Sequence, residues 1–234
     1  MLSLTFMLAI TGAAGDPAPL TVRDRAMVDV FARCIAAKHH DDAKIYALHQ
    51  YGDNWQEASR AFFKLRDMEC APSGAAKSLK KITEGEFKLA LADALVRQDL
   101  ARFDAAMIAG AQPLPNATYV DNLWRKPEDC KACNAKEMEQ LADVRQKMAK
   151  ALAPHLFSEC AVRADPSKVH DMLMTEPNSP AELRTFQTLT PVLSQCLAEG
   201  EAMTVSRPAM RGFLALNYYR VAYAPRVAAA GASK

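Results

Sequence analysis

The chain has few aromatic residues and few glycines. Aromatic side chains make up 7% of its 234 residues and glycine occurs only 9 times, whereas alanine, leucine and methionine are common. Strands are enriched in aromatic and β-branched residues, while alanine, leucine and methionine are good helix formers. This balance excludes an all-β protein and predicts an all-α fold.

Charge of one sign is not concentrated in any segment. The chain has 29 basic and 27 acidic residues, a formal net charge of +2, and the two signs are interspersed. A nucleic-acid-binding protein needs clustered lysine and arginine to neutralise phosphates. We therefore expect no nucleic acid partner, and we interpret the run from Lys77 to Lys81 as the solvated face of a helix.

The chain also lacks a long hydrophobic run. An apolar stretch from Leu2 to Ile10 is too short to span a bilayer, and no later stretch approaches the length of about 18 residues that a span needs. Small residues up to Gly15 and then Asp16-Pro17-Ala18-Pro19 follow it. This order predicts a signal peptide over residues 1–15, although no lysine or arginine precedes the apolar stretch. The alternatives are a misplaced start and an ordinary N-terminal helix. We expect a periplasmic or secreted protein without a membrane span.

Catalytic and metal-binding motifs are missing as well. The sequence has no G-x-S-x-G, H-E-x-x-H, glycine-rich phosphate loop or kinase signature, and His49, His155 and His170 are isolated. The segment from Lys38 to Asp42 contains two histidines and two aspartates, but adjacent helical residues point about 100° apart. We interpret it as a turn between helices. The sequence therefore predicts no catalytic residue, cofactor or metal, and an enzyme is the less favoured class.

What the chain does contain is an internal similarity between its two halves. A shift of 126 residues superposes Phe31 on Phe157, Cys34 on Cys160, Cys70 on Cys196 and Phe87 on Phe213. Each half therefore reads F-x-x-C with a second cysteine 36 positions later. This pattern predicts two related helical bundles from an internal duplication, over residues 16–109 and 134–234, joined by a connector over residues 110–133.

The six cysteines allow 15 pairings in principle. If both halves fold alike, Cys34 pairs with Cys70, Cys160 pairs with Cys196, and Cys130 is left to Cys133. Such disulfides persist in an oxidising compartment, and a bridge closing about 37 residues stabilises a domain by roughly 3.5–4 kcal/mol. Reactive or metal-bound cysteines are the alternatives.

The sequence Cys130-Lys131-Ala132-Cys133 is the one candidate for chemistry. It ends the connector and precedes a helix capped by Asn134, whose N-terminal amides would stabilise a thiolate. No β-α-β pattern surrounds it, residue 134 is not the histidine of a covalent haem motif, and no second ligand pair suggests zinc. We interpret it as a local structural disulfide, with a redox-active dithiol as the alternative.

Capping residues indicate where several helices begin. The predicted N-caps are Thr21, Thr83 with Glu86, Asn134 with Glu137, Asp165 before Pro166, Ser179 before Pro180, and Ser206. Pro191 is expected to break or kink the helix that leads to Cys196. Acidic residues such as Glu84 and Asp93 are assigned to caps and exposed helix faces. Tyr218, Tyr219 and Tyr223 are assigned to core packing with outward hydroxyls.

The stretches Cys160–Pro166 and Met210–Ala215, with Cys196 between them, resemble a pattern in uncharacterised exported helical proteins of Gram-negative bacteria. The similarity covers the C-terminal third of the chain well and the first half only weakly. No activity is attached to that group, so the resemblance implies a periplasmic location and no mechanism.

The absence of catalytic motifs favours a non-enzymatic protein that binds another protein or a peptide. One alternative is thiol-disulfide exchange through Cys130 and Cys133. Another is a periplasmic chaperone, for which the 11 methionines would provide adaptable apolar surface. The sequence indicates neither the partner nor the oligomeric state.

Overall fold

The structure is a computed structural model that describes residues 21–50, 53, 55–116, 126, 128, 130–197 and 203–225. The predicted signal peptide and most of the predicted connector lie outside these ranges. The described elements are α1 (Val22–Lys38), α2 (His40–Leu48), α3 (Trp55–Lys64), η1 (Met68–Cys70), α4 (Ala76–Leu79), α5 (Glu84–Asp99), η2 (Ala105–Gly110), α7 (Ala135–Ala164), α8 (Pro166–Met174), α9 (Pro180–Gln195) and α10 (Arg207–Tyr223).

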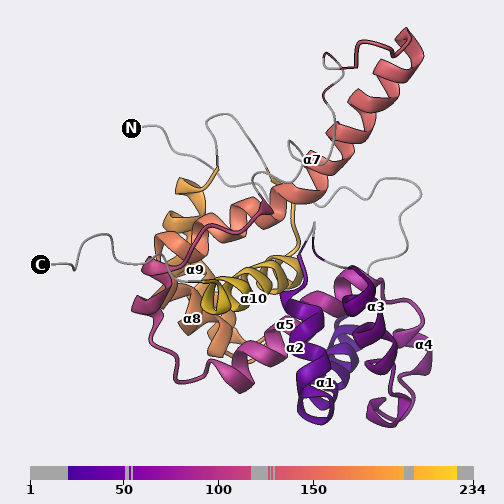
Figure 1. The fold of residues 1–234 in the computed structure, drawn as a ribbon. Coiled ribbons are helices and arrows are strands. Elements are labelled where there is room, and N and C mark those ends of the chain that lie inside the picture. The colour runs from indigo at the N-terminus through magenta and orange to yellow at the C-terminus, as the bar shows by residue number, and fades with distance from the viewer. Residues whose placement is uncertain are drawn as a thin grey trace, which may run out of the picture.

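No strand occurs among the described residues, so the predicted all-α fold is confirmed. Figure 1 shows the helices of the first half and those of the second half meeting where α5 lies against α10. Within the described part of the chain, each helix is too short or too polar to cross a bilayer.

The predicted helix starts are confirmed by their hydrogen bonds. Thr21, Thr83 and Asn134 each form a capping box with the acidic residue three positions later. The side chains of Asp165, Ser179 and Ser206 accept hydrogen bonds from the third helical amides of α8, α9 and α10. Since these bonds form within a single turn, local sequence is sufficient to place them.

Pro191 does not break α9, although a break was one of the two outcomes that we expected, the other being a kink. The helix continues to Gln195, and Pro191 lies on its exposed side. A proline removes one backbone hydrogen bond, and the carbonyl left without a partner can bond to water on an exposed face. Pro154 also lies inside a helix, α7, where it is half-buried. The second disulfide is therefore reached by one uninterrupted helix.

The first part of α7 projects from the body of the molecule (Figure 1). We call residues 135–151 the arm, because none of them is buried and Leu152 is the first buried residue of the helix. α7 thus begins with the arm, after the capping box at Asn134, and continues into a core segment that contains Phe157 and Cys160.

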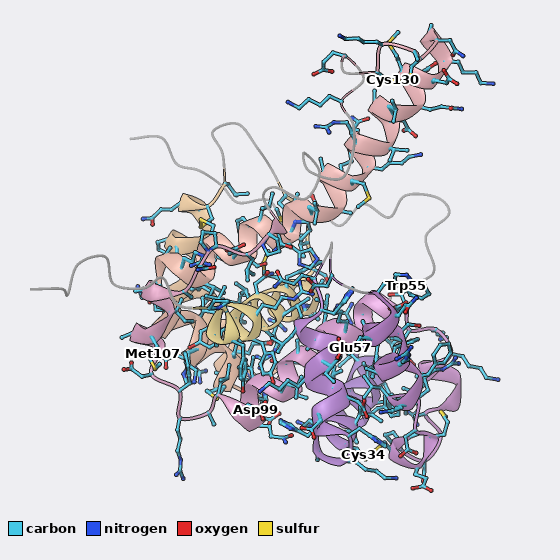
Figure 2. The ribbon with its side chains drawn as sticks, viewed as in Figure 1. Cys34, Trp55, Glu57, Asp99, Met107 and Cys130 are labelled. Carbon is cyan, nitrogen blue, oxygen red and sulfur yellow. A yellow bond between two sulfur atoms is a disulfide. The ribbon has the colours of Figure 1, made fainter. Side chains whose placement is uncertain are left out.

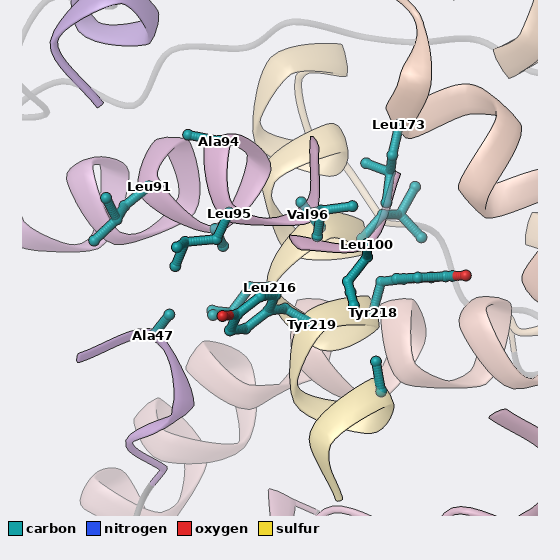
Figure 3. Packing of buried hydrophobic residues seen from close by; sticks show 14 of the residues in the cluster. Ala47, Leu91, Ala94, Leu95, Val96, Leu100, Leu173, Leu216, Tyr218 and Tyr219 are labelled. Carbon is teal, nitrogen blue, oxygen red and sulfur yellow. The ribbon is translucent and has the colours of Figure 1, made fainter. Parts of the chain in front are cut away.

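The core is built around α5 and α10, which pack against each other. Figure 3 shows Leu91 and Leu95 of α5 facing Leu216 and Tyr219 of α10, and these four side chains are at most 2% exposed. α5 also packs on α1, and α10 packs on α7. Because full burial of one leucine contributes roughly 1.5–3 kcal/mol, this central contact is a large part of the stability of the fold.

The approach of the two central helices depends on Gly212. A Cβ atom added at this position of α10 would lie 2.6 Å from Cβ of Leu89 on α5. Real Cβ contacts are longer than this, so a residue without a side chain is needed where the two helices touch.

Tyr218 and Tyr219 lie in the core as expected, but their hydroxyls do not point outward. The Tyr219 hydroxyl donates a hydrogen bond to Oδ2 of Asp99 over 2.6 Å. The Tyr218 hydroxyl is buried and has no hydrogen-bond partner among the described residues. Burial raises the pKa of Tyr218 to about 12. Tyr223 is 39% exposed, so only two of the three rings belong to the core.

Asp93 is buried, which corrects its assignment to an exposed helix face. Its Oδ1 lies 2.9 Å from the Arg211 guanidinium of α10. Arg211 is 3% exposed and also contacts Glu182 of α9 at 3.2 Å. Its Nη2 donates to the Leu173 carbonyl at 2.6 Å. Sequence spacing could not reveal these contacts because the partners come from three different helices.

Helix bounds repeat between the halves. α8 begins 126 residues after α2 begins and ends 126 residues after α2 ends. α1 packs on α5 in the first half, and α7 packs on α10 in the second.

Candidate functional site

The structure places the six cysteines at bonding distance in the three predicted pairs. Cys34–Cys70 and Cys160–Cys196 each span 36 positions, and Cys130–Cys133 spans 3. The two long-range disulfides join α1 to η1 and α7 to the end of α9. One of them therefore braces the first half of the chain and the other braces the second half.

The Cys130–Cys133 pair lies at the far end of the arm (Figure 2). Both cysteines are partly exposed, and Lys131 and Ala132 between them are exposed. The Cys133 amide donates to the Cys130 carbonyl over 3.1 Å, which forms a turn directly before the capped end of α7. This pair is thus remote from the core that the other two disulfides brace.

The two histidines between Lys38 and Asp42 form a turn between helices, as expected. α1 ends at Lys38 and α2 begins at His40. His39 Nε2 lies 2.9 Å from Asp67, and His40 Nε2 lies 2.9 Å from Asp99. The two rings thus contact different carboxylates. No group of three or more metal-ligating side chains occurs among the described residues.

A cavity of about 610 Å³ lies where the end of α2 meets α5, α7 and α10. We call it the Lys88 pocket. Its apolar wall is formed mainly by Leu89, Phe213 and Leu216, and its polar groups include Lys88 and Arg220. Ligand pockets of proteins typically have volumes of about 300–1,000 Å³, so its size suits a small molecule or the end of a peptide.

Lys88 is a partly buried cation without a counter-ion. Its Nζ donates to the His49 carbonyl over 2.9 Å and lies 4.8 Å from the centroid of the Tyr46 ring. No described carboxylate lies within ion-pair distance of it. Burial and the positive charge of Arg220 lower the pKa of Lys88 to about 7. The cation is thus held by a carbonyl dipole and a ring face, which stabilise it less than a carboxylate would.

Arg220 also lines the pocket and is 4% exposed. Its Nε donates to the Ala47 carbonyl at 3.0 Å, and its Nη2 donates to the His49 carbonyl. These carbonyls lie at the C-terminal end of α2, where the helix dipole attracts cations and the last carbonyls lack partners within the helix. The end of α2 therefore positions both positive groups.

The acidic residues at the mouth of the pocket are already engaged. Glu84 accepts a hydrogen bond from the Tyr46 hydroxyl over 2.9 Å. Glu86 accepts from the Thr83 amide and hydroxyl, both at 2.9 Å, as part of the capping box of α5. Both carboxylates thus have other partners, and neither forms an ion pair with Lys88, although the charge of Glu84 raises the pKa of the amine.

Two histidines in the pocket are held in the neutral form. Burial lowers the pKa of His155 to about 3, with the charges of Arg220 and Lys88 acting in the same direction. Burial and Lys88 also lower the pKa of His49. The His155 ring meets the edge of Phe213 at a centroid distance of 5.0 Å. Burial and the positive charges in the pocket thus both disfavour protonation of these two histidines.

Sequence reasoning missed Lys88 and Arg220. Lys88 lies within the apolar run Phe87–Leu91, and a lysine inside such a run is the one available indication that its amine is partly buried. Nothing in the spacing connects it with Arg220, which is 132 positions later. His49 and His155, which appear isolated in the sequence, meet in the same pocket.

Comparisons with protein-family models, curated proteins and solved structures find no significant match.

Two other cavities are less suited to a ligand. One, of about 120 Å³, is lined by Asp29, Asp93, Glu182 and Arg211, whose charges largely pair with each other. Another, of about 530 Å³, lies over Phe31, Phe62 and Phe87 of the first half, where these rings pack together. The second of these cavities is also lined by a lysine, Lys80, but that residue is exposed, whereas Lys88 is partly buried beside its apolar wall.

Proposed function

We propose that the protein is an exported, non-enzymatic binding protein that holds a peptide or protein segment by a carboxylate in the Lys88 pocket. The observation that carries this proposal is the position of Lys88, a cation in a cavity of about 610 Å³ whose nearby carboxylates are engaged elsewhere. A carboxylate would provide the missing counter-charge.

The shape of the site favours the C-terminal end of a chain. In a peptide, the terminal carboxylate is attached to the same carbon as the side chain of the last residue. The pocket has matching groups, because the apolar wall of Leu89, Phe213 and Leu216 lies beside Lys88. Burial of an apolar terminal residue and a charge-assisted hydrogen bond would then act together. The occupant is therefore a peptide that ends in an apolar residue with a free carboxylate.

The test is fluorescence anisotropy with the labelled peptide Ala-Ala-Ala-Leu, prepared as the free acid and as the C-terminal amide. The acid should bind at least ten times more tightly than the amide, since a hydrogen bond to a charged group contributes about 1.5–3 kcal/mol. Lys88→Gln should abolish this preference. Lys147→Gln on the exposed arm, where the lysine pairs with Asp143, is the matched control and should preserve it.

Equal affinity for the acid and the amide would refute the proposal, as would the absence of binding at millimolar acid. Retained preference in Lys88→Gln would assign the carboxylate to a different site.

The position of Cys130 and Cys133 supports thiol-disulfide exchange as a second candidate function. The pair is partly exposed at the end of an arm, where a substrate thiol can approach, and it directly precedes the N-terminus of α7. A redox titration with mass-spectrometric mapping tests this. Reduction at about −120 to −230 mV, while the long-range pairs stay closed, would support exchange, and a potential below about −300 mV would indicate a structural disulfide.

Chaperone activity is a third hypothesis, supported only by the methionine content of 11 residues. Suppression of the aggregation of unrelated unfolded proteins would support it, and failure at molar excess would remove it.

Export is tested by the mass of the secreted protein, which should begin at Asp16.

We also propose that the halves descend from an internal duplication. The shared bounds of α2 and α8, the equal spans of two disulfides and the equivalent packing of α1 on α5 and α7 on α10 support this origin. The test is superposition in an experimental structure of residues 31–48 and 84–96 on residues 157–174 and 210–222. A poor fit at this shift of 126 residues would argue against duplication.

A further inference from the structure

The amine of Lys88 has the surroundings of a nucleophile. It faces a cavity large enough for a ligand, and one hydrogen bond, to the His49 carbonyl, holds it in place. The Tyr46 ring lies beneath it, with the centroid 4.8 Å from Nζ. The lysine is thus positioned without being neutralised by a carboxylate.

We propose that Lys88 captures small 2-oxo acids covalently and reversibly, as an imine between its amine and the ketone carbon. This inference rests on the same pocket as the proposed function, but it does not require that a peptide binds there. The carboxylate of the 2-oxo acid would lie in the positive potential of Arg220, and its short side chain would meet the apolar wall at Phe213 and Leu216.

The charged groups that face Lys88 come from every element around the pocket. Arg220 of α10 lowers the pKa of the amine together with burial, while Glu84 of α5 and Asp53 raise it. The histidines of the pocket, His49 after α2 and His155 of α7, have lowered pKa values and are neutral near pH 7. The resulting pKa near 7 leaves a large fraction of the amine neutral at pH 7.5, whereas an exposed lysine is almost entirely protonated there.

Imine formation requires that neutral amine. Its nitrogen lone pair attacks the ketone carbon, a carbinolamine forms, and one water molecule leaves as the C=N bond is made. The two protons of the amine and the ketone oxygen leave together in that water. No electron is transferred, so no oxidant or reductant is needed, and hydrolysis returns both reactants. Desolvation and a neighbouring cation activate lysines in this way.

The experiment uses the full protein with pyruvate and sodium cyanoborohydride, which reduces an imine to a stable secondary amine. Peptide mapping after a fixed time at pH 7.5 should find Lys88 labelled at least ten times more than Lys147 on the exposed arm. Labelling of Lys88 should reach half its maximum near pH 7.

Two variants and one competitor complete the test. Lys88→Arg should remove this fast labelling and leave the slow labelling of other lysines unchanged. Lys147→Arg should leave the labelling of Lys88 unchanged. The free-acid peptide should slow it, because a bound carboxylate fills the pocket and keeps the amine protonated. Acetone, which lacks a carboxylate, should react with Lys88 at least ten times more slowly than pyruvate.

Uniform labelling of all lysines, or labelling of Lys88 only in urea, would overturn the inference. Equal rates with acetone and pyruvate would overturn the part of the inference that says the pocket recognises the carboxylate of a 2-oxo acid. If the acid peptide binds with the expected preference while Lys88 stays unlabelled, the imine is refuted and the proposed function is retained. Labelling of Lys88 without any peptide binding would refute the proposed function alone.

Discussion

Arg211 of α10 donates a hydrogen bond from Nε to Oδ1 of Asp93 on α5 over 2.9 Å, so a buried ion pair joins the two central helices. Glu182 of α9 lies on the other side of the same guanidinium at 3.2 Å. One side chain therefore joins α10 both to the neighbouring helix α9 and to α5, which is more than 100 positions earlier in the chain. The Lys88 pocket lies between α5 and α10, and its geometry depends on this arrangement.

Arg211→Met should reduce the free energy of unfolding by about 3 kcal/mol, because it removes the cation that lies between the buried carboxylates of Asp93 and Glu182. Arg97 lies 3.4 Å from Asp93 and Arg207 lies 3.3 Å from Glu182, and these remaining cations keep the loss at the lower end of the range for a broken buried pair. Urea denaturation followed by circular dichroism measures the loss. The matched control is Lys147→Met, which removes an exposed pair with Asp143 and should cost about 0.5 kcal/mol or less. A loss below about 1 kcal/mol for Arg211→Met would contradict the structural role assigned to it.

Two helical glycines should respond to alanine with opposite signs. Gly212→Ala places a Cβ atom 2.6 Å from Leu89 and should destabilise the fold by about 1–3 kcal/mol. Gly85→Ala in the first turn of α5 meets nothing closer than 4.0 Å and should stabilise it by about 0.5 kcal/mol. Thermal denaturation of both variants tests this, and unchanged or increased stability of Gly212→Ala would be inconsistent with the close approach of α5 and α10.

Removal of the disulfides should have unequal effects. Each of the Cys34–Cys70 and Cys160–Cys196 bridges closes 36 positions, and replacing either pair by serine should cost about 3.5–4 kcal/mol on the loop-entropy model. Replacing Cys130 and Cys133, which closes only 3 positions, should cost about half as much or less. Urea midpoints of the three double variants provide the comparison. Equal losses would show that loop length does not govern these bridges.

Asp29→Asn should stabilise the protein at pH 7 and have little effect near pH 4. Burial and the charge of Asp93 raise the pKa of Asp29 to about 6, from 3.8. Because the folded state then binds the proton more tightly than the unfolded state, this residue makes stability fall as pH rises from about 4 to 6. The gain at pH 7 should be about 1–2 kcal/mol after allowance for partial exposure. Urea titrations of both proteins at several pH values test this, and a gain independent of pH would contradict it.

Lys88→Met should increase stability at pH 7, by about 1–3 kcal/mol, although it removes the proposed binding group. The folded pKa of about 7 lies below the ordinary value of 10.5, so the unfolded state binds the proton more tightly between these pH values. The stability contributed by Lys88 in the wild type therefore rises with pH over that range. The advantage of methionine should shrink accordingly from pH 7 to pH 10. A stability loss at pH 7 would instead assign Lys88 a structural role.

Features that depend on neighbours in sequence were predictable. Thr83 with Glu86 and Asn134 with Glu137 form their caps within one turn, so the residue types alone place the helix starts. The cysteine pairing followed from the spacing of 36 that recurs in both halves. Pro191 does not break α9, because the effect of a proline depends on whether its face of the helix is exposed, and the sequence leaves that open.

The sequence determined the all-helical class, the helix starts and the cysteine pairing, since each rests on short-range geometry or on a repeated spacing. Only the tertiary structure decided that Asp93 is buried beside Arg211 and that Lys88 and Arg220 line the same cavity. These relationships join residues more than 100 positions apart, and they arise from the packing of α5 against α10. The candidate site was therefore decided by the tertiary structure, because the reactivity of a charged group depends on the residues that surround it.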